Sequence, residues 1–325
     1  QYLGKALTLD GGTVRTRDNL ETRKKQGSYY TPQVIVRYLV RQSLGRVLYG
    51  TEDGTPTGTP IPGEARKTLA DIRDLRVLDS ACGSGSFLIE AYYVLKEFYE
   101  AEVERIEAEY VAAIQELALG GDITLDERVA AQRLENEVTR LKNYPRLILE
   151  THLYGVDLDP QAAEVAVVNL IMRAMERSTG DKRLPLLLNQ NIKVGNGLVG
   201  LRADDPRMAE HLPAIERIRA LRAKLVETPH GAQHDAIVKE LGETSAAVRA
   251  ALDAHITPHF SDLARVRPFH WGLEFPEVFY GAETSPLNPA GTSPLNPLSV
   301  YREGTSRAVE GASDSPSPRA ERGLG

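Results

Sequence analysis

The sequence has 325 residues, 42% of them hydrophobic, which is enough for a buried core in one large domain or two ordinary ones. Its single cysteine excludes a disulfide within the chain, and neither a secretory signal nor a membrane-length apolar run is visible. We therefore expect a cytoplasmic protein without membrane partners. The net charge of -6 excludes a polybasic coat, although residues 1–50 carry nine Lys/Arg and three Asp/Glu, a local excess compatible with weak nucleic-acid binding.

The first predicted element is a helix within the segment "GSYYTPQVIVRYLV", which starts at Gly27. Thr31 stands where an N-cap belongs and Pro32 at the first helical position. Ile35 and Leu39, four residues apart, share one face of the predicted helix. Residues 51–64, rich in Pro, Gly and Thr, predict a loop.

A buried strand and a glycine loop follow in "VLDSACGSGSFLIEA", from Val77 to Ala91. The strand ends at Asp79, and Gly83 and Gly85 lie in the loop that opens the next helix. Between about residues 97 and 143, apolar residues recur three and four apart with a break at 120–122. This pattern predicts a helical hairpin inserted into the domain.

Two more strands are predicted. "HLYGVDLD", residues 152–159, ends in acid, and "NIKVGNGL", residues 191–198, ends in a glycine turn. The intervening "AAEVAVVNLIMRAM" predicts a helix packed on both sides. Strands that alternate with helices indicate an α/β fold, in which a parallel sheet is covered by helices on both faces and ligands bind at the carboxyl ends of the strands. Asp79, Asp157 and Asn196 all occupy such ends.

The rest of the chain predicts a second helical insert, an aromatic stretch and a tail. The insert covers residues 206–256, and the aromatic stretch runs from Phe269 to Tyr280. Residues 281–325 contain six Gly, six Pro and seven Ser and repeat "TSPLNP", so we expect disorder there. We expect residues 1–26 to be a lead-in from a longer protein and residues 27–280 to form the main domain.

The glycine loop fits neither common nucleotide motif. It lacks the third glycine of the dinucleotide fingerprint, and no Lys-Ser/Thr pair follows it as in a Walker loop. Acids at two strand ends and a polar turn at the third suit a positively charged amino acid fused to a nucleoside. Asp79 would lie near a methionine amino group, Asp157 on the ribose hydroxyls and Asn196 by the adenine. The competing interpretation is a nucleotide-free domain whose acids cap strand ends.

Four segments in this order, "GSYYTPQVIVRYLV", "VLDSACGSGSFLIEA", "LYGVDLDPQAAEVAVVNL" and "NIKVGNGLVG", resemble the motifs of adenine-specific N6 DNA methyltransferases of the gamma class, above all type IIG restriction-modification and phage-defence enzymes. The resemblance implies a Rossmann-like methyltransferase sheet, S-adenosylmethionine as cofactor, double-stranded DNA as partner in the complete enzyme, and a fused or separate nuclease and specificity region. No metal is implied. The cofactor contacts that it implies are Tyr30, Thr31, Pro32, Asp79, Ala81, Gly83, Gly85, Asp157 and Asn196.

The family's catalytic Asn-Pro-Pro-Tyr segment does not occur, although "FHWGLEFPEVF" resembles the approach to it. The pairs Asn288-Pro289 and Asn296-Pro297 belong to the repeated tail, so no catalytic residue is assigned. Three hypotheses remain open: a catalytically incomplete adenine methyltransferase, a methyltransferase acting on a protein amide, and a non-catalytic S-adenosylmethionine-binding or interaction module. Cys82, which has no histidine partner nearby in sequence, is expected to be a packing residue.

Overall fold

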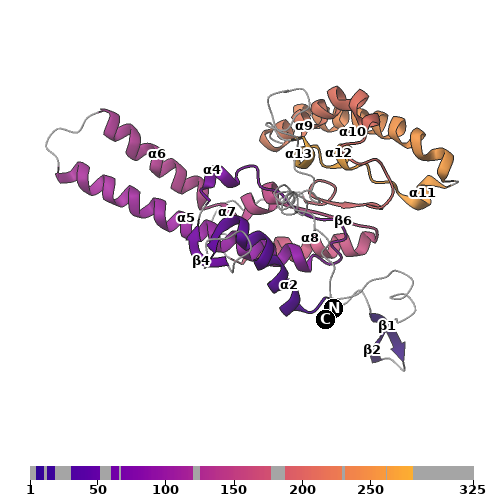
Figure 1. Ribbon diagram of the computed structural model, residues 1–325, viewed down its shortest axis with the longest axis horizontal. Coiled ribbons are helices and arrows are strands. Elements are labelled where there is room, and N and C mark those ends of the chain that lie inside the picture. The colour runs from indigo at the N-terminus through magenta and orange to yellow at the C-terminus, as the bar shows by residue number, and fades with distance from the viewer. Residues whose placement is uncertain are drawn as a thin grey trace, which may run out of the picture. The chain divides into compact units, whose positions relative to one another are not determined.

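A three-stranded parallel sheet lies at the centre of the region that carries the predicted motifs (Figure 1). Its strands are β5 (Val77–Asp79), β6 (Leu153–Asp157) and β7 (Ile192–Val194), in the order β5-β6-β7. The three predicted strands are thereby confirmed, although β5, which was predicted to be buried, is half-buried. Since all three strands run the same way, their carboxyl ends share one edge of the sheet.

The computed structural model describes residues 5–10, 13–18, 31–51, 60–65, 67–119, 125–176, 187–228, 231–260 and 262–280. Contacts divide the chain into two units, Gln1–Val278 and Phe279–Gly325. The predicted tail at 281–325 and the candidate contact Tyr30 lie outside the described residues, as does most of the predicted loop at 51–64.

Two antiparallel strand pairs precede the parallel sheet. β1 (Lys5–Asp10) pairs with β2 (Thr13–Asp18), and β3 (Tyr49–Thr51) pairs with β4 (Pro60–Ala65). The prediction of an unbroken loop over residues 51–64 is wrong at its end, where β4 begins. A two-stranded ribbon tolerates the prolines of β4, because each strand there has one edge that needs no ladder partner.

Helix α2 (Gln33–Val40) begins one residue later than predicted and buries a different face. Pro32 is its N-cap, and the Pro32 carbonyl accepts from the backbone N–H groups of Ile35 and Val36, so the predicted Thr31 cap is wrong. Val36 and Val40 are buried, whereas Ile35 and Leu39 are 45% and 46% exposed. The four-residue spacing of Ile35 and Leu39 correctly predicted a helix. Val36 and Val40 have the same spacing, and packing buries that pair instead.

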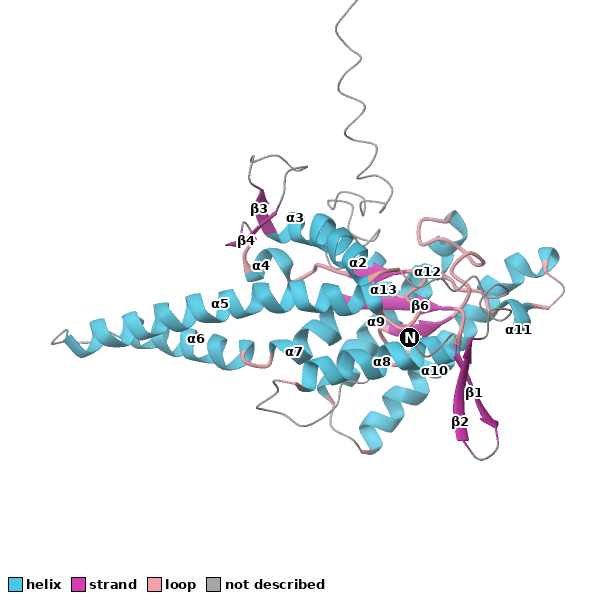
Figure 2. Ribbon diagram, turned by 90° about the horizontal axis from the view of Figure 1, so that it is seen from below, coloured by secondary structure: helices cyan, strands magenta, loops and turns pink. Residues whose placement is uncertain are grey.

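Helix α5 (Ser86–Leu119) starts directly after the glycine loop and runs without interruption for 34 residues. It lies alongside α6 (Leu125–Leu141), which confirms two packed helices in this region (Figure 2). The first arm of the predicted hairpin is therefore a continuation of the loop helix. At residue 97 the chain is already in the core, because the neighbouring Phe98 is fully buried, while Ile114 further out is 42% exposed.

Helices cover both faces of the sheet (Figure 1). α5 and α8 (Pro160–Met175) contact β6 on one face, and Tyr154 of β6 meets Phe275 on the other, with ring centroids 5.4 Å apart. The prediction that α8 packs on both sides is wrong. Its alanines and Leu170 face the core, but Met172 is 60% exposed, so α8 is a one-sided surface helix.

The second predicted helical region consists of α9 (Leu212–Glu227) and α10 (Ala232–Ile256), which pack against each other. The remaining helical elements are short: η1 (Arg41–Gly45), α3 (Arg46–Leu48), α4 (Leu69–Ile72), α7 (Tyr144–Leu147), η2 (Ile148–His152), η3 (Pro206–His211), η4 (Thr257–His259), α11 (Leu263–Val266), α12 (Trp271–Glu274) and α13 (Pro276–Phe279). No helix in the described part of the chain combines the length and apolarity needed to cross a membrane.

Candidate functional site

The glycine loop between β5 and α5 is fixed by backbone hydrogen bonds and by close packing. The N–H of Cys82 donates to Val156 of β6 at 2.8 Å, and the N–H of Gly85 donates to Cys82 at 2.8 Å. Gly83 and Gly85 have φ angles of +52° and +86°, a region that favours glycine. A Cβ on Gly85 would lie 3.2 Å from the Cβ of Ala166, so glycine also allows the loop to pack against α8.

Asp157, at the end of β6, connects its own loop to the glycine loop. Its Oδ2 accepts from the N–H of Gly83 at 2.8 Å, and its Oδ1 accepts from the N–H of Asp159 at 2.8 Å. Asp159 in turn caps α8 by accepting from the N–H of Gln161 at 3.0 Å. Asp157, the predicted ribose ligand, thus also holds the glycine loop and its own loop in place. The sequence analysis did not predict this structural role.

Asp79, at the end of β5, has one carboxylate oxygen in use and one left over. Its Oδ1 accepts from the N–H of Ala81 at 3.1 Å. Its Oδ2 is buried and has no hydrogen-bond partner among the described residues. Burial raises the pKa of Asp79, and the nearby charge of Asp157 raises it further against the opposing effect of the Ala81 hydrogen bond. The site therefore holds an acid with one buried oxygen to which no described residue donates a hydrogen bond.

The turn after β7 brings the third strand end to the same place. Oδ1 of Asn196 accepts from the N–H of Leu198 at 3.1 Å, which closes the turn. A Cβ on Gly197 would lie 3.4 Å from the carbonyl oxygen of Ser80, the residue that follows Asp79. The loops after β5 and β7 thus meet across the end of β6, as the parallel sheet predicts.

Helix α2 is held on α5 by ion pairs that set its direction. The guanidinium of Arg37 lies 3.7 Å from Glu90, and Arg41 donates to Glu97 at 2.7 Å. Because the later residue of α2 pairs with the later residue of α5, the two helices run in the same direction. The start of α2, with a half-buried Thr31 and an exposed Pro32, therefore lies toward the glycine-loop end of α5.

A buried charge cluster fixes the aromatic segment to the sheet, and sequence reasoning missed it. Lys193 of β7 donates to the carbonyl and to Oε2 of Glu274, at 2.7 and 3.0 Å. Arg249 pairs with the other oxygen of Glu274, and Arg222 donates to its carbonyl at 3.0 Å. Burial lowers the pKa of Lys193 to about 8, against the opposing effect of Glu274. A lysine within an otherwise apolar strand was the available sequence signal.

Cys82 is a packing residue, as predicted. It is 5% exposed, and burial raises the pKa of its thiol, with further contributions from Asp79 and Asp157. A buried thiol that resists ionisation is a poor nucleophile. Cys82 therefore does not supply a nucleophile to the site.

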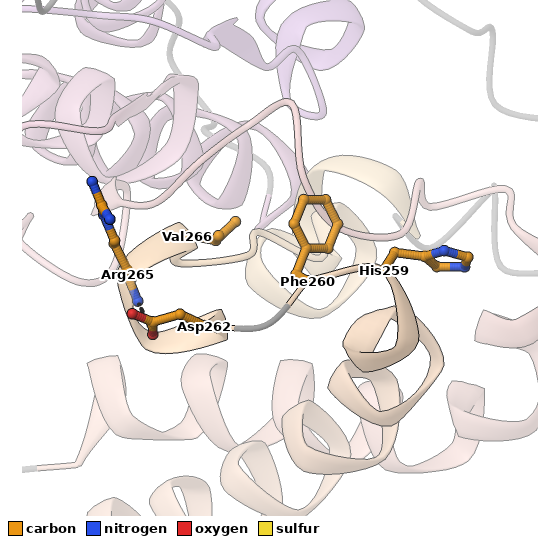
Figure 3. A pocket seen from close by; sticks show the side chains of 5 residues that line it. All are labelled: His259, Phe260, Asp262, Arg265 and Val266. Atoms are coloured by element: carbon orange, nitrogen blue, oxygen red, sulfur yellow. Dashed lines mark hydrogen bonds between the residues drawn. The ribbon is translucent and has the colours of Figure 1, made fainter.

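A surface pocket of about 430 Å³ lies on the segment that leads into the aromatic stretch (Figure 3). It is lined by His259, Phe260, Asp262, Arg265 and Val266. Oδ1 of its one acid, Asp262, accepts from the N–H of Arg265 at 3.0 Å and so caps α11. None of the predicted cofactor contacts lines this pocket, and we do not assign the cofactor to it.

A parallel sheet with acids at the ends of adjacent strands, a glycine loop and helices on both faces define an α/β domain. Residues 62–204 match the DNA-methyltransferase domain of MmeI. The chain is 31% identical over 163 residues to the adenine-specific methyltransferase BrxX of Escherichia coli O9:H4 (strain HS). This alignment covers 45% of this chain and 11% of BrxX.

Two further relatives are restriction enzymes and methyltransferases, one of them putative. The chain is 26% identical over 175 residues to the type II restriction enzyme and methyltransferase RM.Eco57I of Escherichia coli, covering 52% of this chain and 14% of the relative. It is 27% identical over 207 residues to a putative enzyme of the same kind from Methanocaldococcus jannaschii, covering 55% and 15%. The predicted resemblance to adenine-specific methyltransferases of restriction-modification type is confirmed. The matches span only a small part of each relative.

Proposed function

We propose that residues 27–200 bind S-adenosylmethionine and that the chain supplies the cofactor-binding part of an adenine-N6 DNA methyltransferase of a restriction-modification or phage-defence system. In this proposal residues 27–280 form a Rossmann-like domain with helical inserts at about 97–143 and 206–256. The strand order β7-β6-β5 supports this, because it corresponds to one half of a doubly wound sheet. Because its proposed substrate is DNA, we expect the protein to act in the cytoplasm.

The observation that carries the proposal is the unpartnered Oδ2 of Asp79 at the end of β5. A buried carboxylate oxygen without a donor is costly unless a ligand supplies one. The ammonium of the methionine portion of the cofactor would bring a positive charge and the donor that Oδ2 of Asp79 lacks among the described residues. The chemistry of this residue therefore fits the proposed cofactor.

The nucleoside portion fits the neighbouring strand ends. Each oxygen of Asp157 accepts one backbone hydrogen bond and retains acceptor capacity for ribose hydroxyls. Leu158, the next residue, is 55% exposed and offers an apolar surface beside that acid. Asn196 lies at the next strand end, near the proposed position of the adenine.

The loop backbone and the start of α2 complete the proposed site. Ala81, Gly83 and Gly85 would let the ligand approach the loop backbone closely. Tyr30, Thr31 and Pro32 would cover the ligand, which the parallel run of α2 and α5 supports for the two described residues.

The sulfonium of the bound cofactor supplies a reactive methyl group. The chain's residues hold and orient that cofactor, but methylation also needs an adenine that has left the duplex and is aligned with the methyl. The Asn-Pro-Pro-Tyr segment that grips the base in related enzymes does not occur in these 325 residues. We propose that the chain by itself binds the cofactor and does not methylate DNA.

Isothermal titration calorimetry of the purified chain with S-adenosylmethionine tests the cofactor assignment. Asp79→Asn should weaken binding by about 10- to 150-fold, because a charge-assisted hydrogen bond contributes about 1.5 to 3 kcal/mol. Asp74→Asn is the matched control, since Asp74 is 59% exposed and precedes the opposite end of β5. Absence of binding to the parent, or equal affinity for the parent and Asp79→Asn, would overturn the assignment.

Transfer of tritiated methyl groups to mixed-sequence DNA tests the second half of the proposal. We expect no turnover from this chain, and turnover from a version extended with a complete catalytic segment. Positioning contributes about 7 to 11 kcal/mol to such reactions, so its loss leaves almost no rate. Turnover by the unextended chain that is abolished by Asn288→Ala or Asn296→Ala would show that the tail carries a working motif.

A further inference from the structure

We propose that Trp271 contacts the nucleoside end of the bound cofactor and forms one wall of the site beside Asn196. This inference rests on the proposed S-adenosylmethionine site. Trp271 lies 75 positions beyond Asn196 (271 less 196) and outside the segments that predicted the cofactor contacts. Only the tertiary structure brings it to the strand ends.

The position of Trp271 follows from a backbone ladder between two distant segments. The N–H of Asn196 donates to Arg267 at 2.8 Å, and the N–H of Phe269 donates to Val199 at 2.7 Å. The N–H of Trp271 donates to Leu201 at 3.1 Å. Residues 196–201 and 267–271 therefore run side by side, and Trp271 is fixed at the end of this pairing.

The indole folds back over the turn after β7. Its Nε1 donates to the carbonyl of Gly197 at 3.2 Å, and its Cζ2 lies 3.0 Å from where a Cβ on Gly197 would stand. The carbonyl oxygen of Ser80 is 3.4 Å from the same point. The indole edge thus reaches the place where the loops after β5 and β7 meet.

The indole ring of Trp271 packs against two buried phenylalanines and remains partly exposed. Its centroid lies 4.8 Å from that of Phe269 and 6.5 Å from that of Phe275, and both phenylalanines are buried. Trp271 itself is only partly buried. A rigid, partly exposed aromatic ring next to Asn196 suits contact with a nucleobase, because every base has an aromatic face and contact with it needs little further ordering.

Trp271 is the single tryptophan of the chain, so its fluorescence reports on this position alone. Titration with S-adenosylhomocysteine should change the emission of Trp271 and protect it from quenching by acrylamide, with the affinity that calorimetry gives. Adenosine at higher concentration should act in the same way. S-methylmethionine, which has the sulfonium and the ammonium but no nucleoside, should leave emission and quenching unchanged.

Substitution separates contact from a purely structural role. Trp271→Leu should weaken binding of S-adenosylhomocysteine by about 5- to 30-fold, in line with about 1 to 2 kcal/mol for an aromatic contact to a base. Trp271→Phe, which keeps an aromatic ring, should recover part of that loss. Thermal unfolding and circular dichroism establish that each variant is folded before its affinity is compared.

The possible results distinguish the role of Trp271 from the proposed cofactor site. Calorimetric binding by the parent with unchanged emission and quenching would overturn the role of Trp271 and leave the cofactor site intact. Full affinity in folded Trp271→Leu would also overturn it. No calorimetric binding by the parent would instead overturn the cofactor site itself.

Discussion

The carboxylate of Asp157 accepts a 2.8 Å hydrogen bond from the backbone N–H of Gly83, although the two residues are 74 positions apart. The gap is filled largely by α5 and α6, whose outer parts project from the core rather than enter the site. The parallel pairing of β5 with β6 brings the two ends together whatever the length of the connection. The long insert is therefore compatible with an ordinary arrangement of the two strand ends.

Asp157→Ala should lower both the stability and the cofactor affinity, because it removes the tether of the glycine loop together with the proposed ribose ligand. Hydrogen bonds to a charged group contribute about 1.5 to 3 kcal/mol. Thermal unfolding and calorimetry measure the two effects separately. Asp159→Ala is the control: losing the cap of α8 should cost about 1 kcal/mol of stability without changing affinity. Unchanged stability in Asp157→Ala would show that the tether contributes nothing.

Asp79→Asn should stabilise the ligand-free chain while it weakens ligand binding. The pKa of Asp79 is raised in the folded state, so the folded chain holds this proton more tightly than the unfolded chain does. Stability that comes from the protonated form is lost as the pH rises through the folded pKa, and at pH 7 the buried charge is a net cost. Asparagine removes that cost.

Thermal unfolding of the parent and Asp79→Asn, measured at pH 7 and at successively lower pH, checks this sign. The advantage of Asp79→Asn should shrink as the pH falls, since protonation relieves the parent of the same charge. An advantage that grows toward low pH, or a less stable variant at pH 7, would contradict the environment described for Asp79.

Removing one partner of the buried Lys193–Glu274 pair should cost more than removing a surface pair. Glu274→Leu leaves the ammonium of Lys193 buried without its carboxylate, which costs about 3 to 5 kcal/mol. Asp204→Asn breaks the exposed pair with Arg202 and should change stability by less than about 1 kcal/mol. Chemical denaturation measures both. Equal, small effects would show that Lys193 is not held by Glu274.

The outer part of the hairpin should be dispensable for cofactor binding, and its base should not. Replacing residues 112–135 with a short glycine-serine linker should leave calorimetric affinity unchanged, because most of the residues in this range whose burial is described are exposed. Removing residues 97–143 should prevent folding, because it takes away buried Phe98 and the 2.8 Å hydrogen bond between Tyr99 and His152. Loss of binding in a folded 112–135 variant would place the tip at the cofactor site.

The sequence by itself determined the strands of the central sheet. Short apolar runs that end at Asp79 and Asp157 specify strands and their carboxyl ends, because burial and chain direction are both visible in a few consecutive residues. Alternation with helices then requires those ends to share one edge. The cofactor hypothesis needed no more than that edge and the glycine loop.

Only the tertiary structure decided which groups on that edge meet. Both faces of α2 carry apolar residues at helical spacing, and contact with α5 determined that Val36 rather than Ile35 is buried. The approach of Trp271 to Gly197 has no local signal, because it depends on a ladder between segments far apart in the chain. Periodicity reports how one segment distributes its apolar surface, whereas partners are chosen by the packing of the whole sheet and its helices.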